Sequence, residues 1–226
     1  MIYCFGDSWG EGYELDFAKG ERPFVHHLSK ELNLKFKNLS ISGNSYPVIV
    51  TQIFDNIRNI QKDDIVLIVI PPDIRWMDER DKRYDHQGVG GFRSWSLGTG
   101  DLVNRRYVSW LGNKTKVWFR YHASLFTYAI QSALDSIGCR YLFMHNYGGE
   151  FIIDHRFKSL INTDNFLDVK KSLTTLLGGK DEYEAWNLKA DGPQVDLHDD
   201  KYFEGTRGHP NELGHKRIVE LIKEKI

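Results

Sequence analysis

The sequence contains only two cysteines, Cys4 and Cys139, among its 226 residues. Small secreted domains held together by disulfides carry cysteine at a much higher density, so a disulfide framework is excluded. Both cysteines lie in apolar, strand-like runs, where a free cysteine packs as a small hydrophobic residue. We therefore predict that both are reduced and buried in the core.

Long hydrophobic runs and an excess of charge of one sign are missing as well. No apolar run approaches the ~20 residues of a membrane-spanning helix, and we expect no membrane association. The 30 Lys and Arg nearly balance the 31 Asp and Glu, which leaves no electrostatic basis for nucleic-acid binding. The first residues show no basic segment followed by a long apolar stretch, so we expect a soluble, cytoplasmic protein.

Short apolar runs alternate with segments of helical periodicity. The run Ile65–Ile70 has no polar alternation, which is typical of a strand buried on both faces of a parallel sheet. This alternation predicts a single domain over residues 1–226, a three-layer α/β/α sandwich with a mostly parallel, flavodoxin-like sheet. The predicted strands cover residues 2–5, 35–40, 65–70 and 140–145, and the predicted helices cover 24–33, 47–60, 117–137, 166–177 and 213–226.

Residues 78–114 interrupt the alternation. They are rich in Arg, Gly, Asp and Trp and carry no clear periodicity. Long irregular stretches in compact domains are often binding loops. We therefore predict an insertion or lid over about 78–114 that controls access to the site.

The most informative motif is Gly6-Asp7-Ser8-Trp9-Gly10, which directly follows the first strand. A serine on a tight turn flanked by glycines presents both its hydroxyl and its backbone N–H, as acyl-transfer chemistry requires. Polar residues also follow the second strand, at Ser42 to Ser45, and the third, at Asp73. The carboxyl ends of parallel strands share one edge of the sheet, so these loops should meet. His209, before the last helix, is a candidate base.

Two other interpretations of these residues are weaker. Gly-x-Ser-x-Gly also matches the nucleophile elbow of α/β-hydrolases, but several strands precede the serine in that fold, and here only five residues precede Gly6. His209 and His215 are not spaced as a metal pair on one helix face, and no cysteine or acidic cluster accompanies them. We expect no metal site.

In order and placement, Gly6-Asp7-Ser8, Gly43 and the block His209-Pro210-Asn211 with Gly214 resemble the SGNH (GDSL-type) hydrolase superfamily. The resemblance implies an ester hydrolase with Ser8 as the nucleophile and His209 as the base. It further implies an oxyanion hole formed by the N–H groups of Ser8 and Gly43, with the Asn44 side chain as a helper, and no cofactor. We expect an acetyl or other small acyl ester of a carbohydrate as the substrate.

The sequence departs from the family pattern at two places. The third block lacks its asparagine and reads Pro71-Pro72-Asp73-Ile74-Arg75. Three roles therefore stay open for Asp73 and Arg75: a rim ion pair, contact with the substrate, or, for Arg75, replacement of the missing asparagine as an oxyanion donor. Thr206 stands where the family has its triad acid, three residues before His209.

The candidates for that acid are Asp199, Asp200 and Glu204, and a Ser-His dyad without an acid is the other possibility. Loss of an oxyanion donor and of the acid together would leave little activity. A degenerate domain that binds a carbohydrate or serves as a structural component is therefore the alternative function.

Overall fold

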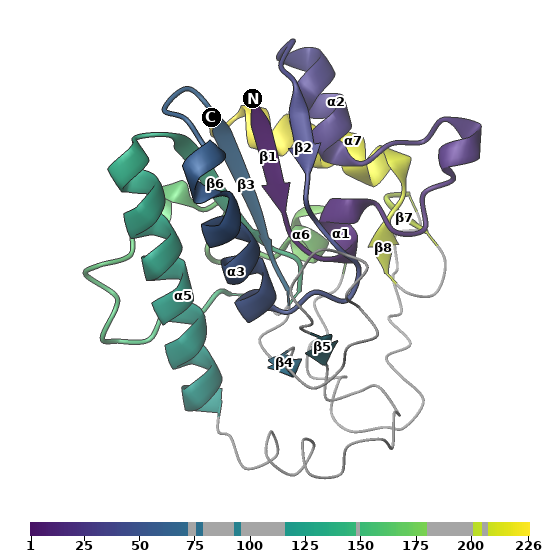
Figure 1. The fold of residues 1–226 in the computed structure, drawn as a ribbon. Helices are drawn as coiled ribbons and strands as arrows, with labels where there is room; N and C mark the ends of the chain where they lie inside the picture. Colours follow the sequence, from purple (N-terminus) through teal and green to yellow (C-terminus); the bar gives the residue numbers. More distant parts are fainter. Residues whose placement is uncertain (72–75, 79–92, 96–115, 148–149, 180–200, 205–207) are drawn as a thin grey trace.

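The computed structural model describes residues 1–71, 76–78, 93–95, 116–147, 150–179, 201–204 and 208–226, with the backbone alone at 76–78, 93–95, 116 and 204. Helices cover both faces of a central sheet, which gives the three layers seen in Figure 1. The α/β sandwich predicted from the alternation of strands and helices is thus present.

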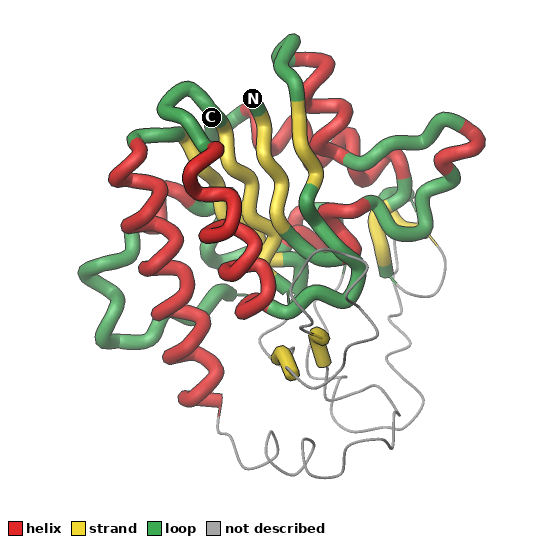
Figure 2. The backbone as a smooth tube through the Cα atoms, in the orientation of Figure 1, coloured by secondary structure: helices red, strands yellow, loops and turns green. Residues whose placement is uncertain are grey.

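The central sheet has four strands, β1 (Ile2–Phe5), β2 (Phe36–Asn38), β3 (Ile65–Ile70) and β6 (Arg140–His145). Their order is β2-β1-β3-β6 and every pairing is parallel. The strands run side by side in Figure 2, and their carboxyl ends lie along one edge. In register, Cys4 of β1 pairs with Leu67 of β3, which in turn pairs with Leu142 of β6.

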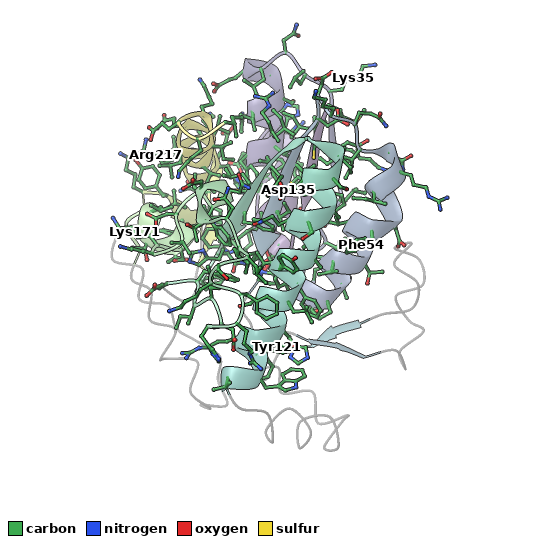
Figure 3. The ribbon with its side chains drawn as sticks, turned by 90° about the vertical axis from the view of Figure 1, so that its left-hand side faces the viewer. Lys35, Phe54, Tyr121, Asp135, Lys171 and Arg217 are labelled. Atoms are coloured by element: carbon green, nitrogen blue, oxygen red, sulfur yellow. The ribbon has the colours of Figure 1, made fainter. Side chains whose placement is uncertain are left out.

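The two faces of the sheet build two separate cores. Helices α2 (Phe24–Glu31) and α7 (Glu212–Lys223) cover one face, and α3 (Tyr46–Asn56) and α5 (Lys116–Ile137) cover the other. Along β3, Leu67 packs toward the first pair of helices and Ile68 toward the second. This alternation explains why all six residues of β3 are apolar and buried. In Figure 3, Arg217 of α7 and Phe54 of α3 lie on opposite sides of the sheet.

The remaining elements are short. They are α1 (Ser8–Glu11), α6 (Leu173–Leu176), the 3-10 turns η1 (Phe17–Lys19), η2 (Ile57–Asn59) and η5 (Thr163–Asn165), and the antiparallel pairs β4 (Trp76–Asp78) with β5 (Arg93–Trp95) and β7 (Phe203–Glu204) with β8 (His209–Pro210). The turn predicted at residues 6–10 is therefore the start of a short helix.

The helix predicted over 166–177 is largely wrong. Only Leu173–Leu176 is α-helical, and Phe166 instead forms a parallel bridge to Phe143 at the edge of the sheet. Two polar side chains interrupt the helical pattern. Asp168 accepts hydrogen bonds from the backbone N–H groups that follow it, and Ser172 caps the start of α6. Such local hydrogen bonds compete with helix formation.

Both cysteines are free and buried, as predicted. Burial raises the pKa of the Cys4 thiol to about 12, so this group is inert. Within the described part of the chain, no helix is long and apolar enough to cross a membrane. The predicted lid at 78–114 lies outside the described residues apart from Asp78 and the strand β5.

Candidate active site

The first site element is the turn from β1 into α1. Asp7 caps the helix, and its Oδ1 accepts a hydrogen bond of 3.1 Å from the backbone N–H of Trp9. Ser8 is the first residue of the helix, where a backbone N–H has no partner within the helix. A Cβ on Gly10 would lie 2.9 Å from the Cβ of Ser40, so only glycine allows α1 to pack this close to the end of β2. Gly10 thus allows α1, which begins with Ser8, to lie against the end of β2.

Ser8 and His209 are brought together although they lie at opposite ends of the chain. His209 lies on β8, immediately before α7, and its Nε2 is 2.9 Å from the Oγ of Ser8. Its Nδ1 is 3.0 Å from the Oε2 of Glu14. An ionised carboxylate can only accept a hydrogen bond, so the network assigns the ring proton to Nδ1 and leaves Nε2 to accept from the Ser8 hydroxyl. This is the protonation state that a general base requires.

Glu14 reaches His209 because the chain reverses after α1. Gly12 ends the helix with φ 86°, and Glu14 itself has φ 74°, a left-handed conformation that residues other than glycine rarely adopt. Residues in such conformations cluster at functional sites, where the surrounding structure holds them. The side chains of His209 and Glu14 are 11% and 21% exposed, so both lie at the protein surface yet are partly shielded from water.

The ring of Tyr13 lies beside the imidazole of His209. The two ring centroids are 5.2 Å apart, and the planes are inclined by 57°. Tyr13 is 39% exposed. The base is therefore bordered by an aromatic surface that solvent can reach.

The second loop at this edge follows β2 and contains Gly43. The backbone N–H of Asn44 donates to the carbonyl of Ile41 over 3.0 Å, and Gly43, with φ 82°, takes the left-handed position of a type II turn. Glu11 of α1 holds this turn, because its carboxylate accepts hydrogen bonds from both the backbone N–H and the hydroxyl of Ser42. No carbonyl of the described residues accepts from the N–H of Gly43.

Asn44, predicted as a helper of the oxyanion hole, is engaged elsewhere. Its amide nitrogen donates to the carbonyl of Gly6 and to the Oε1 of Gln52, both at 3.1 Å. Both amide hydrogens are therefore used inside the protein, and Asn44 is buried. This arrangement argues against the helper role and makes Asn44 a link between the two loops instead.

The acid beside His209 is Glu14, a residue that the sequence analysis did not consider. Asp199 and Asp200 lie outside the described residues, as do Asp73 and Arg75. Glu204 is described by its backbone alone, which pairs with that of His209 in the β7–β8 pair. The one signal for Glu14 was a carboxylate in the glycine-rich segment that directly follows the serine.

His215 serves the core of the protein. Its Nδ1 accepts a hydrogen bond of 3.2 Å from the backbone N–H of Phe24, at the start of α2. Burial, with further contributions from His27 and His209, lowers its pKa to about 3, so the ring is neutral. Among the described side chains, no group of three or more His, Cys, Asp or Glu is arranged to hold a metal ion.

No protein-family model matches the sequence, and no curated protein matches it either. Among solved structures, the chain is similar to the psychrotrophic esterase EstA from Pseudoalteromonas sp., with 11% identity over 99% of this chain and 94% of that one, at a TM-score of 0.50. A G-D-S-L family lipolytic protein from Veillonella parvula and a lipase from a goat rumen metagenome are each 15% identical, over 99% of this chain and 96% of theirs, at TM-scores of 0.48 and 0.49.

Identities this low bear on the fold alone. The likeness to EstA over nearly the full length confirms the α/β fold that the sequence predicted.

Proposed function

We propose that this protein is a serine ester hydrolase in which Ser8 is the nucleophile, His209 the general base and Glu14 the acid that orients it. The observation that carries the proposal is the continuous hydrogen-bonded series from Ser8 Oγ through His209 to Glu14, at 2.9 and 3.0 Å. A nucleophile, a base and a residue that orients the base define a catalytic triad by geometry rather than by their order in the sequence. The fold shared with an esterase supports the same reaction class.

In this mechanism, Ser8 Oγ attacks the ester carbonyl while His209 Nε2 takes its proton. Glu14 stabilises the imidazolium that forms. The N–H groups of Ser8 and Gly43 donate to the oxyanion of the tetrahedral intermediate. His209 then returns the proton to the departing alcohol, which leaves an acyl group on Ser8. Water, activated by the same histidine, releases the acid and restores the serine.

For the substrate, we propose an acetyl or other small acyl ester of a carbohydrate. The support is Tyr13, whose ring lies against the imidazole of His209 and is 39% exposed. An aromatic face beside the base offers a surface on which the sugar of the leaving alcohol can pack. An acetylated monosaccharide should therefore be a better substrate than p-nitrophenyl esters. For a site that takes a small acyl group, the turnover of p-nitrophenyl esters should decline as their acyl chain lengthens. Faster turnover of long acyl chains would contradict this substrate class.

The alternative is a domain that binds without catalysis. The missing third-block asparagine favours it, because the sequence around Asp73 supplies no amide. The absence of an acid three residues before His209 does not favour it, because the Glu14 carboxylate contacts His209 Nδ1 instead. The two functions differ in whether Ser8 is chemically activated.

Labelling with a fluorophosphonate separates these functions, because the reagent modifies an activated serine whatever the natural substrate is. The wild type should be labelled, and Ser8→Ala should not. Ser136→Ala is a matched control, since Ser136 is an exposed residue of α5 whose hydroxyl donates to a carbonyl of its own helix. Wild-type protein that resists the reagent would support the binding domain, and labelling of Ser8→Ala would place the nucleophile elsewhere.

A further inference from the structure

The two residues that follow β6 contact both halves of the candidate site. β6 ends at His145, and Asn146 and Tyr147 come next at the carboxyl edge of the sheet. The side chain of Asn146 contacts Asp7, and that of Tyr147 contacts both Trp9 and Gly208. Asp7 and Trp9 flank the nucleophile, and Gly208 directly precedes the base.

The contact of Asn146 fixes the residue before the nucleophile. Its amide nitrogen donates to Asp7 Oδ2 over 2.8 Å, while Asp7 Oδ1 accepts from the backbone of Trp9. Asp7 and Asn146 are both fully buried. A buried carboxylate needs hydrogen-bond donors in place of water, so this contact ties the cap of α1 to the end of β6.

The contact of Tyr147 fixes the residues after the nucleophile and before the base. The indole Nε1 of Trp9 is 3.0 Å from the hydroxyl of Tyr147, and the carbonyl of Gly208 is 3.2 Å from the same hydroxyl. The indole N–H can only donate and the carbonyl can only accept, so the phenol accepts from Trp9 and donates to Gly208. The Trp9 and Tyr147 rings also meet edge to face, with centroids 5.2 Å apart.

We infer that Tyr147, supported by Asn146, is a positioning residue that sets the separation of Ser8 and His209. The inference rests on the proposed function. The two catalytic groups lie 201 positions apart in the chain, on separate elements. A displacement of about 1 Å at a reacting group can lower a rate by about 10²-fold. One phenol that binds the neighbour of each group holds both elements in register.

Tyr147→Phe tests this inference because it keeps the ring and removes only the hydroxyl. Tyr141→Phe is the matched control. Tyr141 lies on β6 itself, and its hydroxyl donates to Asp135 and accepts from Asn165. These partners belong to α5 and η5, which are not part of the candidate site. Steady-state turnover of p-nitrophenyl acetate and the rate of fluorophosphonate labelling are measured well below the unfolding temperature of each variant.

The expected result for Tyr147→Phe is a kcat about 10- to 100-fold lower, slower labelling in proportion, and a KM within about twofold of the wild type. Tyr141→Phe should keep the wild-type kcat. A wild-type kcat in Tyr147→Phe would overturn the inference. So would an equal loss in both variants, which indicates general loosening of the fold, or a raised KM with unchanged kcat, which indicates substrate contact.

Spectra of protein labelled with ¹⁵N-histidine give a readout that does not depend on activity. The ring nitrogens of His209 are assigned by comparison with His209→Gln. Tyr147→Phe should shift these signals, and Tyr141→Phe should leave them in place. If the wild type proves inactive and unlabelled, the proposed function fails, and these spectra alone decide the coupling. Unchanged His209 signals in Tyr147→Phe would then overturn it.

Discussion

Ser8 and Glu14 contact opposite nitrogens of the same imidazole, that of His209. Both belong to the short segment formed by α1 and the reversal after it. Glu11, midway between them, holds the turn of Gly43 through Ser42. One segment near the start of the chain thus carries the proposed nucleophile, contacts the proposed base and holds the proposed oxyanion loop.

Glu14→Gln should lower kcat by about 10²- to 10⁴-fold, because an amide can favour the wrong tautomer of His209 and cannot stabilise an imidazolium as a carboxylate does. The measurement is steady-state hydrolysis of p-nitrophenyl acetate. Glu21→Gln is the control, since Glu21 lies in the same connection but accepts from the backbone of Asp16. A Glu14→Gln variant with near wild-type kcat would show that a Ser-His dyad suffices.

Activity should depend on pH through a single ionisation. His209 can accept the serine proton only when its ring is neutral, so turnover should rise from acid to mildly alkaline pH. His209→Ala should lower the rate by orders of magnitude and remove this rise. The pH profiles of kcat/KM for the two proteins provide the test. A rise that persists unchanged in His209→Ala would assign the base to another residue.

Glu11→Ala should weaken catalysis more modestly, by about threefold to tenfold in kcat. The substitution removes the acceptor of two hydrogen bonds from Ser42, and a hydrogen bond to a charged group contributes roughly 1.5–3 kcal/mol, less at a solvent-exposed site. The turn then holds the Gly43 N–H less firmly, while the triad stays intact. Ser42→Ala, which keeps the backbone contact, should lose less than Glu11→Ala. The reverse order would argue against this role for the carboxylate.

The buried His215 should make stability depend on pH. Its pKa is lowered to about 3 in the folded state, against 6.5 for an ordinary histidine. Between these two values the unfolded chain binds a proton that the folded protein does not, so the free energy of unfolding rises with pH and falls as the solution is acidified. Where the ring is fully protonated in the unfolded chain and fully neutral in the folded protein, His215 changes the free energy of unfolding by about 1.4 kcal/mol per pH unit.

His215→Gln removes this titration and keeps an acceptor for the Phe24 N–H. Urea unfolding at several pH values between 4 and 7 should show a shallower decline for this variant than for the wild type. His155→Gln, at a side chain that is 81% exposed, is the control. Parallel curves for His215→Gln and the wild type would mean that His215 does not cause the acid sensitivity.

The sheet and its main helices could be predicted because each leaves a pattern of apolar residues in its own stretch of sequence. Ile65–Ile70 is apolar at every position since both faces of β3 are covered, and the period of α5 follows from packing on one side. The segment from Phe166 to Ser172 could not be predicted in the same way. There the apolar residues also fit a helix, and the side-chain hydrogen bonds of Asp168 and Ser172 decide against it.

The residues of the candidate site also differ in whether the sequence could predict them. Ser8 and Gly43 follow neighbouring parallel strands, whose carboxyl ends share one edge of the sheet. His209 lies on β8, outside that sheet, and could be predicted only from the motif that contains it. Glu14 has no such marker, and Tyr147 follows a predicted strand but belongs to no recognised motif. Glu14 reaches the base only through a left-handed backbone, and Tyr147 contacts Gly208 only after the chain has folded. Contacts made by tertiary structure alone leave no pattern along the chain.

The 201 positions between Ser8 and His209 also separate them in time. A ribosome adds about 5–20 residues per second, so the base emerges roughly 10–40 s after the nucleophile. Throughout that interval the growing polypeptide carries Ser8 and Glu14 with no imidazole between them. In the proposed mechanism, acyl transfer therefore cannot begin before β8 has been made and has brought His209 to Ser8.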